Sequence, residues 1–157
     1  MKNEPGNANI LLAVGNPMRG DDGIGPYAAE VLGAMNHPAW KVINAEMVPE
    51  NFTSVVRKAH PEMLVILDAA YMGLEPGEVR IIPPKNIGVM HFSTHAIPLS
   101  VFMEQMAECA DEVLLLGIQV DTDNLELGSE ISAVAKSWAE DVIRKLVEAG
   151  PQSFPSL

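Results

Sequence analysis

The stretch that decides the fold is Ile10-Leu11-Leu12-Ala13-Val14-Gly15-Asn16-Pro17-Met18-Arg19-Gly20-Asp21-Asp22-Gly23-Ile24-Gly25-Pro26. Its first five residues form a continuous apolar run, which is typical of a strand covered on both faces, as in a parallel sheet. A glycine-rich turn follows, and Pro26 then stands where proline favours the first turn of a helix. The stretch therefore predicts a strand, a tight loop and a helix, which is the first unit of an α/β fold.

Similar apolar runs recur downstream. Because strands buried on both faces read as continuous apolar runs, these segments predict the inner strands of a sheet. A weaker run that begins at Trp40 and an alternating run before Pro83-Pro84 fit less buried strands, the second of them at a sheet edge. We predict strands at residues 10–15, 41–44, 63–68, 78–82 and 113–118.

Amphipathic stripes lie between the strands and predict helices. Asn51 and Ser129 are suited to cap the second and fourth of these helices, and Gly150-Pro151 is suited to end the fourth. Strands that alternate with helices predict an α/β fold, here a three-layer sandwich with a twisted, mainly parallel sheet of about five strands and helices on both faces. The helices are predicted at residues 26–35 and 52–59, from about Ala96 onward, and at 130–148.

The length and charge of the chain limit its organisation. A chain of 157 residues buries roughly 70% of its unfolded surface when it folds as one domain. We therefore expect a single domain over residues 1–150, followed by a loose tail over residues 151–157.

The formal net charge of -11 comes from 21 acidic and 10 basic residues. This excess repels nucleic-acid phosphates and anionic membrane surfaces, and it favours a basic partner.

The cysteine content and the absence of targeting signals indicate the compartment. Cys109 is the only cysteine, so an intramolecular disulfide is excluded, and its place in a helical stripe indicates a half-buried apolar residue. Residues 1–9 lack the pattern of a signal peptide, and no apolar run approaches the roughly 18 residues of a membrane span. We expect a soluble, cytoplasmic protein without membrane insertion.

The glycine-rich turn after the first strand is the first candidate site. Its spacing matches neither GxGxxG nor a P-loop, and Asp21 and Asp22 stand where a phosphate would need N–H donors. Two carboxylates repel an anion, so a nucleotide-binding protein is a disfavoured alternative that a nucleotide-binding measurement would separate. The turn suits a metal ion or a basic or amide-rich polypeptide. We assign a substrate-binding loop to Gly15, Asn16, Gly20 and Gly23.

Asp68 and His95 are the other candidate site residues. Asp68 ends a buried strand, where an isolated carboxylate costs several kcal/mol unless it caps a backbone, is paired or binds a metal. Ligand sites in open α/β sheets lie beyond the carboxyl ends of the strands, which places Asp22 and Asp68 at the same end. His95 begins a predicted helix, where the helix dipole favours the neutral imidazole that a metal needs. Together the three residues would suit zinc, nickel or another first-row divalent ion.

Several short segments between residues 10 and 120 form one ordered set: Val14-Gly15-Asn16, Gly20-Asp21-Asp22-Gly23-Ile24-Gly25-Pro26, Pro49-Glu50-Asn51, Leu67-Asp68-Ala69, Met72-Gly73-Leu74-Glu75-Pro76-Gly77-Glu78, Ser93-Thr94-His95, Pro98-Leu99 and Leu116-Gly117-Ile118-Gln119. In these segments the sequence resembles the hydrogenase maturation endopeptidase family, of the HycI and HybD type. The fold that this resemblance implies is a twisted, mainly parallel sheet between helices.

The resemblance also implies an activity. Such proteins remove the C-terminal extension of a nickel–iron hydrogenase large-subunit precursor once nickel has been inserted. The family's metal-binding positions fall here on Asp22, Asp68 and His95. The family is taken to recognise nickel already held by the substrate, so the expected cofactor is a divalent metal, nickel above all, which the precursor supplies. Zinc or cadmium could substitute for it. The expected partner is that precursor, and we expect the protein to be a monomer.

Two mechanisms stay open from the sequence. Water on the metal could attack the scissile carbonyl, or Asp21 or Asp22 could act as general base in an aspartic-type mechanism. One position departs from the family pattern: relatives carry aspartate where this chain has Asn44, and an amide cannot act as a base, although Glu46 lies two residues on. A non-hydrolytic nickel-dependent chaperone or sensor would use the same ligands, and a missing substrate mass shift would identify it.

Overall fold

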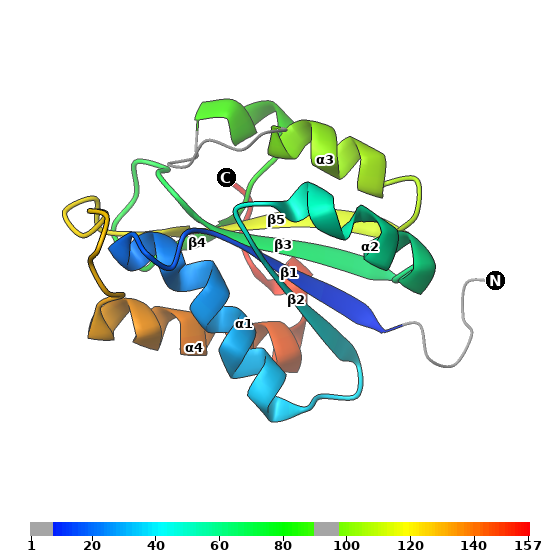
Figure 1. Ribbon diagram of the computed structural model, residues 1–157, viewed down its shortest axis with the longest axis horizontal. Helices are drawn as coiled ribbons and strands as arrows, with labels where there is room; N and C mark the ends of the chain where they lie inside the picture. The colour runs from blue at the N-terminus through cyan, green and yellow to red at the C-terminus, as the bar shows by residue number, and fades with distance from the viewer. Residues whose placement is uncertain (1–7, 90–97) are drawn as a thin grey trace.

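Five strands form one sheet in the order β2-β1-β3-β5-β4 in the computed structural model, which describes residues 8–89 and 98–157 (Figure 1). Neighbouring strands are parallel except for β4, which is antiparallel to β5. All five strands form where the apolar runs predict them, with bounds that differ by up to two residues. The strands are β1 Asn9–Val14, β2 Trp40–Glu46, β3 Met63–Ala70, β4 Val79–Ile81 and β5 Glu112–Gln119.

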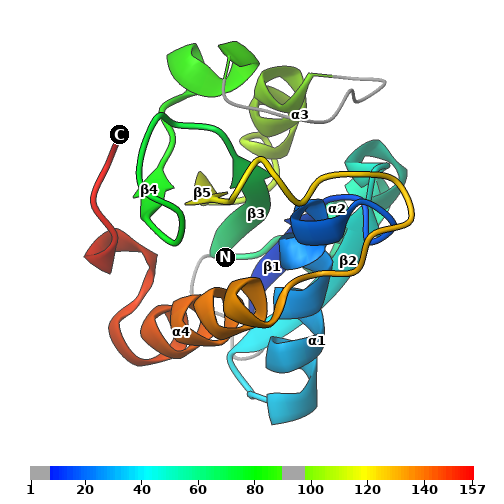
Figure 2. The same cartoon turned by 90° about the vertical axis from the view of Figure 1, so that its left-hand side faces the viewer.

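Helices cover both faces of this sheet, so the predicted three-layer α/β sandwich is confirmed. Helices α1 and α4 lie together on one face, and α2 and α3 lie on the other (Figures 1 and 2). Short 3-10 turns lie between these elements. The helices are α1 Ile24–Met35, α2 Thr53–Ala59, α3 Leu99–Met106 and α4 Ala133–Ala149, and the 3-10 segments are η1 Gly20–Gly23, η2 Pro49–Phe52, η3 Pro84–Val89 and η4 Pro151–Ser153.

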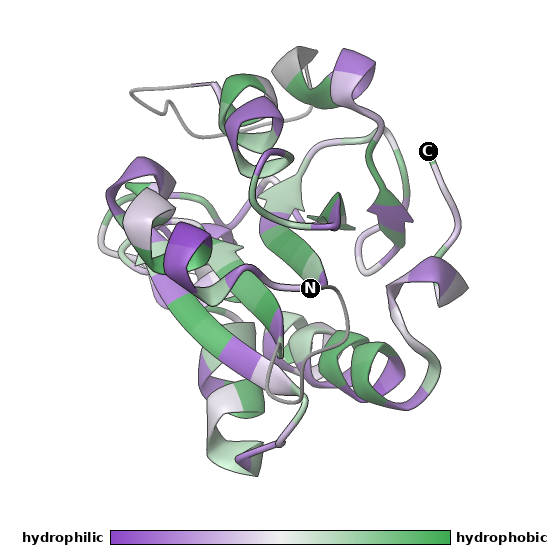
Figure 3. Ribbon diagram, turned by 90° about the vertical axis from the view of Figure 1, so that its right-hand side faces the viewer, coloured by the Kyte–Doolittle hydropathy of each residue, from purple (hydrophilic) through white to green (hydrophobic). Residues whose placement is uncertain are grey.

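The inner strands contribute to two hydrophobic layers. On β1, Ile10 and Leu12 belong to the cluster under α2 and α3, whereas Leu11 between them belongs to the cluster under α1 and α4. Because successive side chains of a strand point to opposite faces, a strand buried on both faces needs apolar residues throughout. Figure 3 shows this as hydrophobic colour along the strands of the middle layer. Each fully buried aliphatic side chain contributes about 1.5–3 kcal/mol of hydrophobic free energy.

Two predicted helix caps are wrong. Helix α4 begins at Ala133 with Ser132 as its N-cap, whose Oγ accepts a hydrogen bond from the Ala135 amide, so Ser129 lies in the preceding loop. Asn51 lies inside η2, and Phe52 precedes α2 without a side-chain cap. Pro49 begins η2 ahead of α2, and the Ser129 carbonyl accepts a hydrogen bond from the Gly20 amide ahead of α4.

The end of α4 and the tail that follows it compare differently with what the sequence predicts. Gly150 ends α4, as predicted, and its amide donates to the Leu146 carbonyl at 3.0 Å. The following residues, 151–157, are predicted to be loose, but the structure packs them against β4. The Leu157 amide donates to the Ile81 carbonyl at 2.9 Å, and the Phe154 side chain is buried. The backbone of the tail thus supplies hydrogen-bond partners to the outer edge of β4.

Two further sequence expectations concern Cys109 and the membrane. Cys109 is buried, more deeply than predicted, and its thiol donates to the Met106 carbonyl at 3.4 Å. Burial raises the pKa of the Cys109 thiol. In the described parts of the chain, no helix combines the length and the apolar content needed to cross a bilayer.

Candidate active site

The loop after β1 brings its two aspartates to the carboxyl end of the sheet. It can do so because two glycines let backbones approach closely. A Cβ at Gly15 would lie 2.2 Å from the Asp22 carbonyl oxygen, and one at Gly25 would lie 2.3 Å from the Val14 oxygen and 2.9 Å from the Leu67 oxygen. The start of α1 therefore packs directly on the ends of β1 and β3, and η1 also contacts β3.

Asp22 is buried at this end, with 2% of its surface exposed. Its Oδ2 accepts a hydrogen bond from the Asn16 amide at 3.0 Å. The Asn16 side chain in turn accepts from the Met18 amide at 2.9 Å, so the turn that holds Asp22 is itself closed by a side chain. The rotation of the Asp22 carboxylate is thus restrained by the loop that carries it.

Asp68 is completely buried, two residues before the end of β3. It lies opposite Gly117 of β5 in the parallel register. A Cβ on Gly117 would come within 2.4 Å of Ile82 Cδ1, so the strand facing Asp68 has no room for a side chain there. Asp68 is therefore buried near the end of a strand, where the sequence places it. Binding of a metal ion by Asp68 stays a prediction.

His95, the third predicted ligand, lies outside the described residues. Helix α3 starts at Leu99, so the segment that carries His95 leads directly into that helix. Within residues 8–89 and 98–157, no group of three or more histidine, cysteine, aspartate or glutamate side chains is arranged to hold a metal ion. Asp22 and Asp68 are both buried, and metal binding by these two residues and His95 stays a prediction.

Asp21 has different partners from its neighbour Asp22, although both are buried. Its Oδ1 accepts from the Asn124 side-chain amide and from the Ser132 backbone amide, both at 2.8 Å, and its Oδ2 accepts from the Ser132 hydroxyl at 3.1 Å. These donors belong to the loop between β5 and α4. The Asp21 carboxylate therefore ties that loop and the first turn of α4 to η1.

The residues assigned to a substrate-binding loop have clear backbone roles. Gly20 has a positive φ of 55°, and a Cβ there would lie 2.3 Å from the Asn124 carbonyl oxygen. A Cβ at Gly23 would lie 3.0 Å from Pro17 Cα. Like Gly15, both glycines allow the loop to pack on neighbouring backbone, and Asn16 holds Asp22. Contact of these residues with a substrate stays a prediction.

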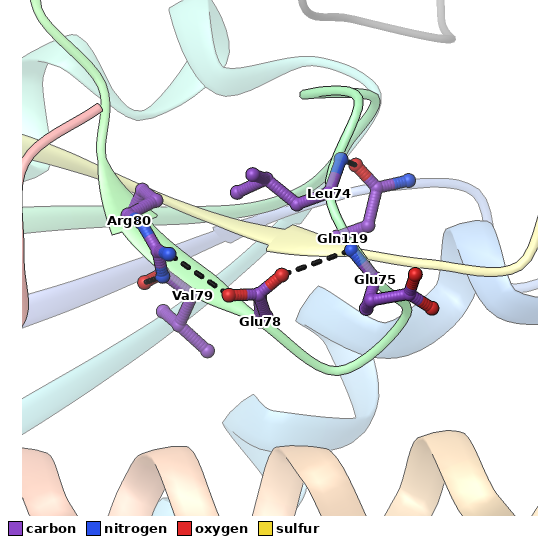
Figure 4. Close-up of polar contacts among 6 residues, drawn as sticks. All are labelled: Leu74, Glu75, Glu78, Val79, Arg80 and Gln119. Atoms are coloured by element: carbon purple, nitrogen blue, oxygen red, sulfur yellow. Dashed lines mark hydrogen bonds and ion pairs between the residues drawn. The ribbon is translucent and has the colours of Figure 1, made fainter.

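Gln119, which the sequence analysis left without a role, organises the segment after β3. It is buried, and its Oε1 accepts from the Met72 amide at 2.6 Å and from the Leu74 amide at 3.3 Å. Figure 4 shows Gln119 at the end of β5 reaching this segment. The signal that could have revealed it is the one used for Asp68, a polar residue that ends an otherwise apolar buried strand.

The same segment is held at its far end by Glu78. Its carboxylate accepts from the Glu75 amide and from the Arg80 guanidinium, both at 2.9 Å (Figure 4). The hydrogen bond from Glu75, and then the contacts with Arg80, lower the pKa of the Glu78 carboxyl. The segment between β3 and β4 therefore has side-chain anchors at both of its ends.

Asn44, which replaces the aspartate of the family pattern, lies exposed on β2 opposite Ala13. Glu46 is also exposed and has a positive φ of 50°, at an irregularity where β2 leaves its register with β1. Its carbonyl accepts from the Gly15 amide at 2.8 Å. Glu46 thus borders the loop after β1 through a backbone hydrogen bond.

The fold and these residues define a class: an α/β protein with buried carboxylates at the carboxyl end of a mainly parallel sheet. Comparison with known proteins agrees. Residues 26–149 match the HycI family, described as hydrogenase maturation protease. The hydrogenase 3 maturation protease of Escherichia coli strain K12 is 46% identical over 114 residues, which cover 72% of this chain and 73% of that protein.

Solved structures give the same result. The solution structure of the endopeptidase HycI from Escherichia coli has a TM-score of 0.82 and 38% identity, with 96% of both chains covered. The crystal structure of a nickel–iron hydrogenase maturation protease HycI from Thermococcus kodakarensis has a TM-score of 0.79 and 28% identity, with 92% of both chains covered. This chain belongs to the hydrogenase maturation protease family, as its sequence motifs predict, and it is a hydrolase of the endopeptidase type.

Proposed function

We propose that this protein removes the C-terminal extension of a nickel–iron hydrogenase large-subunit precursor, in the cytoplasm and only after nickel has entered the precursor. The observation that carries the proposal is the presence of two buried carboxylates, Asp22 and Asp68, at one end of the sheet in a member of this protease family. Buried carboxylates at a strand end and a loop are the oxygen ligands that a divalent metal would meet there.

The metal is assigned to the substrate. Asp22, Asp68 and His95 would bind nickel that the precursor brings, because two carboxylates and one imidazole leave coordination positions for groups of the precursor itself. A divalent ion held there supplies a Lewis acid beside the scissile carbonyl. Sharing the ion would align the scissile bond with the acidic loop, and correct orientation alone can lower a barrier by several kcal/mol.

Asp22 is the residue best placed to act on the water that attacks. The Asn16 amide restrains its carboxylate before any substrate arrives, and a restrained base loses little freedom in the reaction. Asp21, the other predicted catalytic residue, accepts three hydrogen bonds from Asn124 and Ser132. To take a proton it would have to weaken these contacts, so its surroundings support an indirect role in catalysis.

The test is a cleavage reaction read by mass spectrometry. The purified precursor is loaded with nickel, or with zinc or cadmium, or left without metal in the presence of a chelator. We expect loss of the C-terminal peptide from the nickel-loaded precursor and none from the metal-free one. Asp22→Asn and Asp68→Asn should abolish cleavage, whereas Asp123→Asn, at an exposed position of the loop after β5, should not.

Two outcomes would contradict parts of this proposal. Efficient cleavage of the metal-free precursor would reject the nickel requirement and favour the purely carboxylate-driven, aspartic-type mechanism. Tight binding of the nickel-loaded precursor without any mass loss would instead favour the non-hydrolytic chaperone or sensor.

A further inference from the structure

The loop between β5 and α4 lies along the loop that follows β1. Backbone hydrogen bonds join them: Gly128 donates to Met18 at 2.7 Å, Gly20 to Ser129 at 2.9 Å and Asp21 to Asn124 at 2.8 Å. Figure 2 shows the segment that leads from β5 to α4 passing beside the start of α1. With the side-chain contacts of Asp21 added, this part of the surface is held in a defined conformation beside the candidate active site.

Two large apolar side chains are exposed on this fixed surface. Met18 is 61% exposed and Leu127 is 68% exposed, more than any other large hydrophobic side chain in the described residues. They are close in space because Gly128, next to Leu127, donates to the Met18 carbonyl. Single exposed apolar residues are common, but adjacent ones on an ordered surface next to a site indicate an interaction surface.

Other exposed apolar side chains lie at the same end of the sheet. Met47 and Val48 follow β2, and Tyr71 follows β3; all three are at least 41% exposed. The carboxyl ends of parallel strands meet at one edge of a sheet, so these residues surround the end that holds Asp22 and Asp68. Exposed apolar side chains therefore lie at the same end of the sheet as Asp22 and Asp68.

The charge at this end indicates the chemistry of the partner. The segments 15–23, 46–52, 71–78 and 120–132 contain one basic residue, Arg19, although the chain has 10 basic residues in all. A negative potential around exposed apolar groups selects a partner face with lysine or arginine around apolar side chains. The acidic residues of these segments are Asp21, Asp22, Glu46, Glu50, Glu75, Glu78, Asp121, Asp123, Glu126 and Glu130.

We propose that Met18 and Leu127, with the exposed carboxylates of Glu126 and Glu130 beside them, form a docking surface for the folded body of the large-subunit precursor. The face of the precursor that binds there is basic with an apolar centre. This inference rests on the proposed function. Docking beside Asp21 and Asp22 raises the effective concentration of the scissile segment at the site. This docking adds protein–protein contacts to the recognition of the precursor's nickel at Asp22, Asp68 and His95.

The test measures affinity instead of cleavage. The full-length protein is titrated with the purified, nickel-loaded precursor, and the Asp68→Asn background prevents turnover. We expect the double variant Met18→Ser/Leu127→Ser to bind about tenfold or more weakly, since two central apolar contacts are lost. The matched control is Met35→Ser/Val55→Ser, which removes two similarly exposed side chains from α1 and α2 and should bind as the parent does.

Charge reversal tests whether the carboxylates of Glu126 and Glu130 attract the precursor. Glu126→Lys/Glu130→Lys should slow association about tenfold at low salt, and the difference should shrink as salt is added. The matched control is Glu62→Lys/Glu108→Lys, which changes the net charge by the same amount. These residues lie near the amino ends of β3 and β5, so the control should have little effect on the association rate. Circular dichroism and thermal unfolding of every variant identify any loss of folded protein.

The outcomes separate this inference from the proposed function. If the Met18/Leu127 and Glu126/Glu130 variants bind like the parent, the docking surface is overturned, even if the parent protein cleaves the precursor. If the precursor binds through these residues but is never cleaved by the protein with Asp68 intact, the docking surface stands and the proposed function fails. If the nickel-loaded precursor binds neither the Asp68→Asn protein nor the protein with Asp68 intact, both are rejected.

Discussion

Ser132 donates two hydrogen bonds to Asp21, one from its backbone amide at 2.8 Å and one from its hydroxyl at 3.1 Å. The same hydroxyl oxygen accepts from the Ala135 amide at 3.2 Å and so caps α4. One serine thus joins the start of the last helix to the acidic loop after β1. A buried carboxylate near a helix N-terminus is also favoured by the helix dipole.

The first prediction concerns this serine. Ser132→Ala removes the cap and one of the bonds to Asp21, and each loss costs about 0.5–2 kcal/mol. We expect the free energy of unfolding to fall by about 1–2 kcal/mol in urea denaturation. The control is Ser137→Ala, an exposed position inside α4, where alanine should be neutral or slightly stabilising. Equal stability of the two variants would show that the contact with Asp21 is not important for folding.

A second prediction separates the two neighbouring aspartates by kinetics. Asp22→Asn should lower kcat by on the order of 100-fold or more, as expected when a general base or a ligand is lost. Asp21→Asn keeps the shape of the side chain but places an amide against donors of Ser132 and Asn124. It should therefore loosen the loop after β5, which raises KM with a smaller change in kcat. Steady-state cleavage of the precursor measures both. A large fall in kcat with KM unchanged for Asp21→Asn would instead make Asp21 catalytic.

Gln119 gives a third prediction, on local dynamics. Gln119→Leu leaves the Met72 and Leu74 amides without their side-chain acceptor, and a buried amide that loses its partner costs about 1–3 kcal/mol. We expect faster hydrogen exchange at these two amides and lower overall stability. Gln152→Leu, at an exposed position of η4, is the control. Unchanged exchange at Met72 and Leu74 would mean that the segment after β3 is held by other contacts.

The contact between α1 and α4 leads to a fourth prediction, which concerns the pH at which the Tyr27 hydroxyl ionises. The hydrogen bond from the Tyr27 hydroxyl to Glu140, at 2.8 Å, is the main cause that raises the pKa of Tyr27. A group whose pKa is raised on folding stabilises the protein below its unfolded pKa, about 10 for tyrosine, and loses that effect as pH rises through the folded value. Ultraviolet titration of the Tyr71→Phe protein isolates Tyr27, and Glu140→Gln should shift its titration to lower pH. No shift would mean that Glu140 does not contact Tyr27 in solution.

Cys109 gives the last prediction. Because burial raises the pKa of its thiol, little reactive thiolate forms at neutral pH, and the native protein should react slowly with a thiol reagent. Unfolding in urea should make the reaction fast. Cys109→Ala should cleave the precursor at nearly the parent rate, and strong inhibition by this substitution would point to a role of the thiol in the reaction.

The parts of the fold that could be predicted are those decided by local pattern. The inner strands β1, β3 and β5 are buried on both faces, so their apolar runs identify them without knowledge of their neighbours. The family motifs likewise identified the protease class. Asp22 and Asp68 could be assigned to one end of the sheet because both follow or end such strands.

What could not be predicted depends on distant residues. The donors to Asp21 lie 103 and 111 positions away in the sequence, so nothing near Asp21 distinguishes it from Asp22. Ser129 resembles a helix cap, but its carbonyl accepts from the Gly20 amide, and the residue that caps α4 is Ser132, three positions later. The tail after Gly150 contains turn residues, yet β4 offers it backbone partners.

The bonds between Asp21 and the loop before α4 also set the order in which the protein can be completed on the ribosome. Strands β1 and β3 and the acidic turn are synthesised before residues 124 and 132, which supply the donors that fix Asp21. A nascent chain therefore carries its aspartates long before the contacts that hold Asp21 in place can form. The contacts that hold Asp21 can form only after the segment that carries Asn124 and Ser132 has been synthesised.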